Sequence, residues 1–153
     1  MIKLFLMVGI VVCCALIGAV IKNYLYVRAE IFKDFNGLCK SISNEISFLK
    51  TDKFTILKNN GDLSKQSKMI VDDYVVLGKV NSIFLKNYEN KAINDLLSSI
   101  GKKDVDGELN NLTYHQNLME NYYNKNEDIY VKYGVFSIKI SIIIGALIVI
   151  FLI

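Results

Sequence analysis

The sequence "LFLMVGIVVCCALIGAVI", residues Leu4–Ile21, runs for 18 residues without a charged side chain and sets the architecture of the chain. At about 1.5 Å per residue, a helix of this length is roughly 27 Å long, close to the ~30 Å hydrocarbon core of a bilayer. A cleaved signal peptide is the alternative, with Lys3 as its charged start, but the small-residue cleavage pattern is poor. We therefore expect an uncleaved N-terminal membrane helix over residues 1–21.

A second apolar run, from about Val135 to Ile153, predicts a C-terminal membrane helix over residues 134–153. Lys139 lies near its start. Helical side chains lean toward the N-terminus of their helix, so we expect Lys139 to reach back to the headgroups as a membrane anchor. The alternative is a buried ion pair with a partner subunit. The helix after Lys139 is short for a full crossing, so we expect local thinning of the bilayer.

The polar middle region, residues 22–133, carries most of the flanking basic residues. Lys22 and Arg28 follow the first apolar run, whereas the outer ends offer a single lysine and the terminal amine. The positive-inside bias then predicts a cytoplasmic middle domain in a two-span cell-membrane protein. Tyr130 and Tyr133 precede the second apolar run and are expected, with Lys22 and Arg28, to lie at the membrane interface.

Apolar residues in the middle region recur at helical spacing, and the chain contains no proline. We therefore predict an all-α fold: a bundle of four to five helices between the N-terminal and C-terminal membrane helices. The first helix of the bundle can continue directly from the first span. The positions that define its buried face are Val27, Ile31, Phe35, Leu38, Ile42, Ile46 and Leu49.

Later helices are predicted from three further apolar patterns. A turn around Asn59 to Gly61 precedes the first of these patterns, and Asp62 or Ser64 could cap the helix that follows. The three patterns comprise Met69, Val76, Val80, Ile83 and Phe84; then Ile93, Leu96, Leu97 and Ile100; then Leu109, Leu112, Met119, Tyr122, Tyr123, Ile129, Tyr130 and Tyr133.

The break "IGKKDVDGEL" before the last helix contains closely spaced acidic residues. A calcium loop with Gly107 at its sixth position would place Lys102 at the first ligand position, so the match fails. Asp104 or Asp106 is instead expected to cap the helix.

Other candidate chemistry is sparse. The single histidine, His115, is expected to be solvated or packed at an edge, and Cys13, Cys14 and Cys39 to be small packing residues. No phosphate loop, metal-ligand pair or nucleophile motif occurs, which predicts a protein that is not an enzyme and needs no cofactor or metal. The 18 basic and 15 acidic residues, a net charge of +3, give no field suited to nucleic acid.

The order of these features resembles a known family. "MIKLFLMVGIVVCCALIGAVIKNYL" leads into "FNGLCKSISNEISFL", and "LLSSIGKKDVDGELNNLTYHQNLMENYYNKNEDIYVKYG" leads into the terminal apolar run. This layout is similar to that of the stage III sporulation protein AB family. The resemblance covers about residues 1–49 and 96–153 and is loose between 51 and 90. In its motifs, Glu45 precedes an isoleucine and Gly101 marks the break, and both are candidate partner contacts.

The resemblance implies a membrane platform subunit of the secretion-like complex that joins mother cell and forespore. Its cytoplasmic domain would look like that of the type II secretion inner-membrane platform protein F. The implied partners are other stage III sporulation A-type proteins, in particular the AA ATPase, besides the bilayer; a homo-oligomer is left open. The alternative is a membrane-bound regulatory or signalling adaptor that binds one soluble partner without forming a channel.

Overall fold

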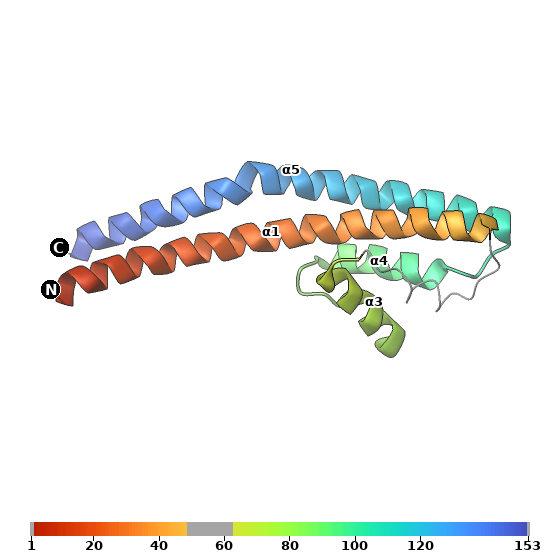
Figure 1. The fold of residues 1–153 in the computed structure, drawn as a ribbon, viewed down its shortest axis with the longest axis horizontal. Helices are drawn as coiled ribbons and strands as arrows, with labels where there is room; N and C mark the ends of the chain where they lie inside the picture. The colour runs from red at the N-terminus through yellow and green to blue at the C-terminus, as the bar shows by residue number, and fades with distance from the viewer. Residues whose placement is uncertain (1, 49–62, 153) are drawn as a thin grey trace. The chain divides into compact units, whose positions relative to one another are not determined.

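The computed structural model describes residues 2–48 and 63–152, and these residues form helices without a strand (Figure 1). The helices are α1 (Ile2–Phe48), α3 (Lys65–Leu77), α4 (Asn87–Ser99) and α5 (Val105–Leu152). The predicted all-α class is confirmed, with four helices in the described part and a long apolar helix near each terminus. The proposed turn residues 59–61, the candidate cap Asp62 and Leu49 lie outside the described residues.

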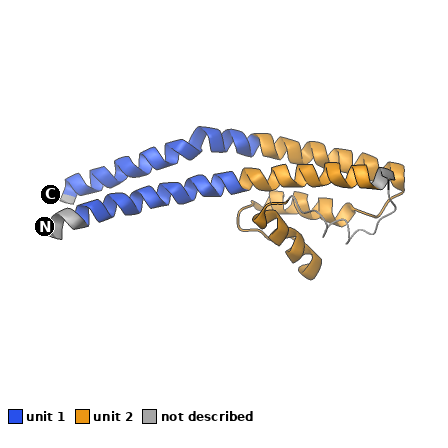
Figure 2. Ribbon diagram, in the orientation of Figure 1, with its two compact units in different colours: residues 1–27, 125–153 blue, residues 28–124 orange. Residues whose placement is uncertain are grey.

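The chain divides into two compact units, which Figure 2 shows in different colours. Unit 1 comprises residues 1–27 and 125–153, and unit 2 comprises residues 28–124. Helix α1 contributes to both units without interruption, as expected from the absence of a breaker between the apolar run and the first predicted bundle helix.

In unit 1, α1 and α5 run antiparallel and approach closely at glycines. A Cβ on Gly18 would lie 2.8 Å from the Cα of Ile138, and a Cβ on Gly145 would lie 3.0 Å from the Cβ of Cys14. The Ser137 hydroxyl lies 3.2 Å from the Gly18 carbonyl oxygen and 2.9 Å from that of Gly134, to which it can donate. Small residues of this kind allow helices to pack backbone against backbone.

In unit 2, α1, α4 and α5 enclose an apolar core. The α1 positions predicted to face it are confirmed where their side chains are described, because each is at most 4% exposed; Val27 in unit 1 shares this burial. The predicted face of α4 is confirmed. The predicted face of α5 is confirmed in part: Leu112 and Met119 are buried, and Tyr133 is exposed. The other predicted α5 positions are half-buried: Leu109, Tyr122, Tyr123, Ile129 and Tyr130. The buried residues from these predictions are Val27, Ile31, Phe35, Leu38, Ile42, Ile93, Leu96, Leu97, Ile100, Leu112 and Met119.

Helix α3 begins as expected. Ser64 is its N-cap, and the Ser67 backbone N–H donates to the Ser64 hydroxyl at 3.4 Å. The Ser64 backbone N–H in turn donates to Asp34 on α1 at 2.9 Å, which ties the start of α3 to α1. One of the two candidate caps in the sequence is therefore confirmed.

The end of α3 was predicted wrongly. The apolar pattern suggested a helix through Phe84, but α3 ends at Leu77 because Gly78 adopts a left-handed conformation with φ +69°. Its N–H donates to the Tyr74 carbonyl at 2.9 Å, which closes the helix. Met69, Val76 and Ile83 of the supposed buried face are instead 57%, 79% and 86% exposed, whereas Val80 is buried as predicted.

Candidate membrane helices and interaction sites

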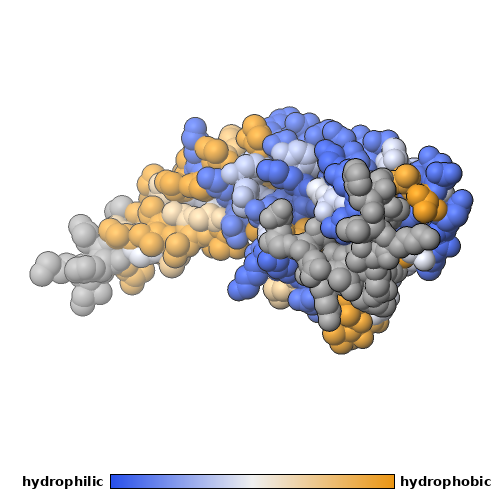
Figure 3. All heavy atoms as spheres, turned by 45° about the vertical axis from the view of Figure 1, so that its right-hand side comes forward, coloured by the Kyte–Doolittle hydropathy of each residue, from blue (hydrophilic) through white to orange (hydrophobic). Residues whose placement is uncertain are grey.

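Helices α1 and α5 are both long and apolar enough to cross a membrane. In the most apolar 18-residue windows of α1 and α5, only 6% and 11% of the window is buried. In the core helix of a soluble protein, most of such a window would be buried. Leu16 and Val20 on α1 are 60% and 69% exposed, and Ile143 on α5 is 58% exposed. Figure 3 shows apolar residues gathered over the unit 1 part of these helices and many hydrophilic residues on the visible face of unit 2.

Small residues recur every four positions along the contact between α1 and α5 in unit 1. On α5 they are Ser137, Ser141 and Gly145, and on α1 they are Cys14 and Gly18. This spacing keeps them on one side of each helix. The contact shows that the two apolar helices pair with each other, which the sequence did not predict.

The expected interface residues of unit 1 have different surroundings. Lys22 is half-buried. A Cβ built on Gly134 would lie 3.5 Å from the Lys22 Cγ and 3.1 Å from the Tyr130 ring, so both side chains contact this glycine. Tyr130 also meets Tyr26 edge to face, with ring centroids 5.5 Å apart. Tyr133 is 46% exposed.

Lys139, the basic residue in the second apolar run, is also exposed. The structure thus brings Lys22 and Tyr130 together, whereas Tyr133 and Lys139 stand apart from this contact.

Arg28, expected at the membrane interface, is instead engaged inside unit 2. Its Nε and Nη2 donate to the two carboxylate oxygens of Glu89 at 3.1 and 2.6 Å. The side chains are 7% and 1% exposed, so this bidentate pair is almost fully removed from water. The guanidinium is therefore not presented to headgroups.

Glu89 has a second role at the start of α4. The Lys86 backbone N–H donates to its Oε2 at 2.9 Å, so the carboxylate satisfies an N–H at the helix N-terminus. Sequence reasoning missed this residue. The signal was a glutamate in the first turn of a predicted helix, together with the single arginine of the chain.

A second polar cluster lies where α4 turns into α5. Gly101 has φ +76°, and its N–H donates to Glu108 Oε1 at 2.8 Å. Asp104 immediately precedes α5 and Asp106 lies in its first turn. The Asp104 Oδ1 is 2.6 Å from where a Cβ on Gly107 would lie, so the carboxylate is folded over the helix start.

His115 is more buried than expected. It is 6% exposed and contacts the edge of Tyr114 at 5.2 Å between ring centroids, so the solvated alternative was wrong. Burial lowers the pKa of its imidazole; the Lys103 cation adds to this, and the Asp95 carboxylate opposes it. Among the described residues, neither the His115 Nδ1 nor the Glu108 Oε2 has a hydrogen-bond partner, and both atoms are buried.

Glu45, the other candidate partner contact, is half-buried on α1. Cys39 is fully buried in the unit 2 core, and burial raises the pKa of its thiol to about 12, so it stays a protonated packing group. Within residues 2–48 and 63–152, no three His, Cys, Asp or Glu side chains are grouped to hold a metal ion.

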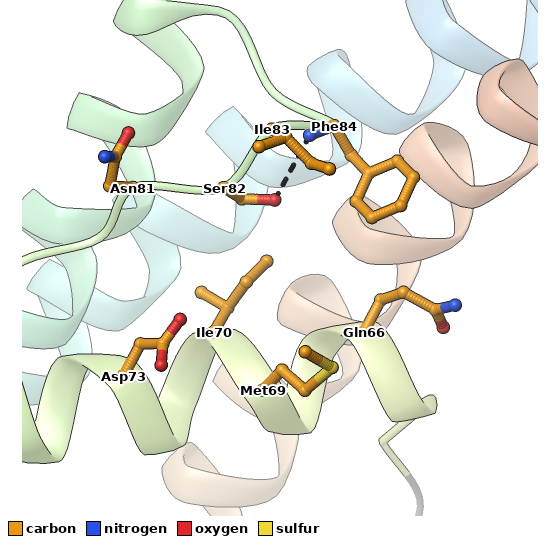
Figure 4. Close-up of a pocket in the computed structure, with 8 residues that line it drawn as sticks. All are labelled: Gln66, Met69, Ile70, Asp73, Asn81, Ser82, Ile83 and Phe84. Atoms are coloured by element: carbon orange, nitrogen blue, oxygen red, sulfur yellow. Dashed lines mark hydrogen bonds between the residues drawn. The ribbon is translucent and has the colours of Figure 1, made fainter.

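An open hollow lies between α3 and the loop before α4 (Figure 4). Its volume is about 240 Å³. The loop is held to α4 because the Ser82 N–H donates to Asn90 Oδ1 at 2.9 Å and the Asn90 amide donates to the Ser82 carbonyl at 3.1 Å. The lining residues are Gln66, Met69, Ile70, Asp73, Asn81, Ser82, Ile83 and Phe84.

These features describe a pair of apolar helices, and a helical unit with a buried ion pair and a hollow beside α3. Comparison with protein-family models, with curated proteins and with solved structures gives no match.

Proposed function

We propose that the chain is a two-span membrane protein that acts as a non-enzymatic platform subunit. Unit 2 would lie in the cytoplasm and bind partner proteins. The observation that carries the proposal is the combination of exposed apolar helices in unit 1 with a separate apolar core in unit 2.

The energetics of the apolar surface favour lipid around unit 1. Fully burying a Val, Leu or Ile side chain is worth roughly 1.5–3 kcal/mol. The exposed ones of unit 1 are about half accessible, so every ten of them in water would cost about 7–15 kcal/mol. Soluble proteins rarely leave so much contiguous apolar surface exposed. Helices α1 and α5 pack closely at Gly18 and Gly145, and close packing at small residues is typical of helix pairs in a bilayer.

The more specific part of the proposal rests on the resemblance to the stage III sporulation protein AB family. Under it, the chain lies in the mother-cell membrane around the forespore and couples the AA ATPase to the other A-type proteins. This role requires a folded cytoplasmic unit held at a membrane. The buried core and the internal ion pair of unit 2 support the proposal that this unit is folded.

Crosslinked purification of the full chain from sporulating cells tests the role. Recovery of the AA ATPase with other complex members is expected. Recovery of neither would refute the platform role, and a single soluble partner without other complex members would favour an adaptor. Orientation is tested separately at Lys102, which is exposed between α4 and α5. Lys102→Cys should react with a membrane-impermeant maleimide only after cell lysis.

The role of Lys139 can be tested by one substitution. If Lys139 is a headgroup anchor, Lys139→Met should leave both membrane insertion and complex assembly nearly intact. Normal insertion with lost assembly would instead identify an ion pair with a partner subunit. Insertion is measured by resistance to carbonate extraction and assembly by co-purification.

A further inference from the structure

The hollow beside α3 is bordered by apolar side chains that no part of the described chain covers. Met69 and Ile83 line it and are 57% and 86% exposed. Ile70 forms part of its floor and is buried. In Figure 4, side chains from α3 and from the loop face each other across the space. Exposed apolar patches of this kind in a water-facing unit mark interaction sites.

Hydrogen bonds hold both sides of the hollow in place. Ser64 ties α3 to Asp34 of α1, and Asn90 of α4 holds Ser82 of the loop through two hydrogen bonds. The Phe84 N–H also donates to the Ser82 hydroxyl at 3.3 Å. A site held in this way is largely formed before a ligand arrives, which lowers the cost of binding.

Its size favours a side chain over a small molecule. A volume of about 240 Å³ exceeds that of a cavity that accepts benzene, ~150 Å³, but is below the ~300–1,000 Å³ of small-molecule pockets. One large apolar side chain, or two small ones, would therefore fill it.

The charged side chain at the hollow itself is an acid. Asp73 is the only charged residue that lines the hollow, it is exposed, and within the described residues it makes no ion pair. At 100° per residue, Lys68 lies about 140° and Asp72 about 100° around the helix from Asp73. Lys65 lies on the same side, about 80° from Asp73, but about 12 Å away along the helix axis, so a cation next to an inserted apolar group would meet Asp73 first.

We propose that the hollow between α3 and residues 81–84 docks a partner protein. The partner inserts an apolar side chain between Met69 and Ile83, and a lysine or arginine within one helical turn of that side chain pairs with Asp73. The inference deepens the proposed platform function by naming the chemistry of its docking segment. A membrane surface is a poorer occupant, because anionic headgroups would repel Asp73.

Site-specific photocrosslinking of the full chain in its membrane tests the proposal. Ile83 is replaced by the photoreactive p-benzoylphenylalanine, cells that express the chain are irradiated, and the crosslinked peptides are identified by mass spectrometry. The expected peptide comes from another protein and has Lys or Arg within four residues of an apolar attachment point. Asp73→Lys should lower the crosslink yield roughly tenfold or more, because a charge-assisted contact is lost.

Asp72→Lys is the matched control, because it makes the same charge change on the neighbouring exposed position outside the hollow. Its yield should stay within about twofold of the parent, since surface substitutions away from a contact have small effects. Crosslinks only to lipid, to a second copy, to this chain itself or to a segment without a basic residue overturn the proposal. So do equal losses in both variants, no loss in either, or no crosslink.

This outcome is separable from that of the platform function. If the AA ATPase co-purifies equally well with the parent and with Asp73→Lys, and no crosslink meets the criterion, the platform role stands and the docking site is wrong. If the criterion is met by a segment of a different protein and no ATPase is recovered, the docking site stands and the platform role is wrong.

Discussion

Replacing Glu89 by glutamine removes the charge that balances Arg28 in unit 2 while keeping nearly the same side-chain shape. In the parent, the carboxylate accepts from Arg28 Nε, Arg28 Nη2 and the Lys86 N–H. Glutamine offers one acceptor oxygen and places an NH₂ donor where the second oxygen was. A donor then faces another donor, and the guanidinium remains buried without its counter-charge.

The expected destabilisation is large because both partners are shielded from water. Glu89 is 1% and the Arg28 side chain 7% exposed. Breaking a buried pair by removing one partner costs about 3–5 kcal/mol, in contrast to about 0–1 kcal/mol for a surface pair. At about 1.4 kcal/mol per tenfold, this lowers the folded-to-unfolded ratio of unit 2 roughly 100- to 4,000-fold.

Cys39 provides the assay, because its thiol is fully buried in unit 2. A maleimide dye labels it only when the unit opens, so the labelling rate follows the open population when reclosing is fast. The full chain is studied in detergent with Cys13→Ala and Cys14→Ala, which leaves Cys39 as the single thiol. Glu89→Gln should raise its labelling rate roughly 100- to 4,000-fold, up to the rate of the unfolded chain.

Two further variants make the test specific. Asp72→Asn removes an exposed acid and should change labelling by less than about threefold. Arg28→Met combined with Glu89→Leu should recover most of the protection, because apolar residues often replace a buried ion pair at little cost. If Glu89→Gln labels within threefold of its parent, the ion pair is not a desolvated stabilising contact and the reasoning fails.

Three further predictions concern other parts of the chain. Oxidation should join Cys14 to a cysteine placed at Gly145 within one molecule. The two Cβ positions are 3.0 Å apart, and a shift of about 0.5 Å brings them to the ~3.5–4.5 Å of a disulfide. The measurement is a mobility shift on non-reducing gels. Folding lowers the imidazole pKa of His115, so its contribution to stability is full above about pH 6.5 and is lost as pH falls toward the folded pKa. His115→Gln should therefore reduce the slope of the unfolding free energy against pH between pH 7 and 5. Gly101→Ala should cost about 1–2 kcal/mol at φ +76°, whereas Gly37→Ala, on an exposed helix face with open space, should gain about 0.5–1 kcal/mol, both by denaturant unfolding.

Each of these predictions has a contrary result. For the crosslink, the control keeps Cys13 and replaces Cys14 by alanine, and an equal yield of crosslink would contradict the described pairing. Equal pH slopes in parent and His115→Gln would show that His115 carries no part of the dependence. Equal effects of alanine at Gly101 and Gly37 would contradict the left-handed backbone at Gly101.

The long helices were predictable because their signals are local and repeated. Ile31, Phe35, Leu38 and Ile42 mark one buried face at regular spacing, and the structure buries all four. Ser64 was predictable as a cap for the same reason, since a capping side chain acts within its own turn.

The errors arose where a distant contact or one backbone angle decided the outcome. The apolar spacing continued past Gly78, but its left-handed backbone ended α3 and exposed Val76 and Ile83. Arg28 looked like an interfacial charge because its partner lies 61 residues away along the chain. Periodicity carries no information on such a pairing.

The bidentate contact between Arg28 and Glu89 also constrains how the sequence can diverge. Losing either residue alone leaves an uncompensated ion in the interior, so single steps at these positions pass through a poorly folded intermediate. Divergent descendants should therefore retain both residues or exchange both for apolar ones. An alignment of such descendants should show positions 28 and 89 changing together, although 60 residues of sequence separate them.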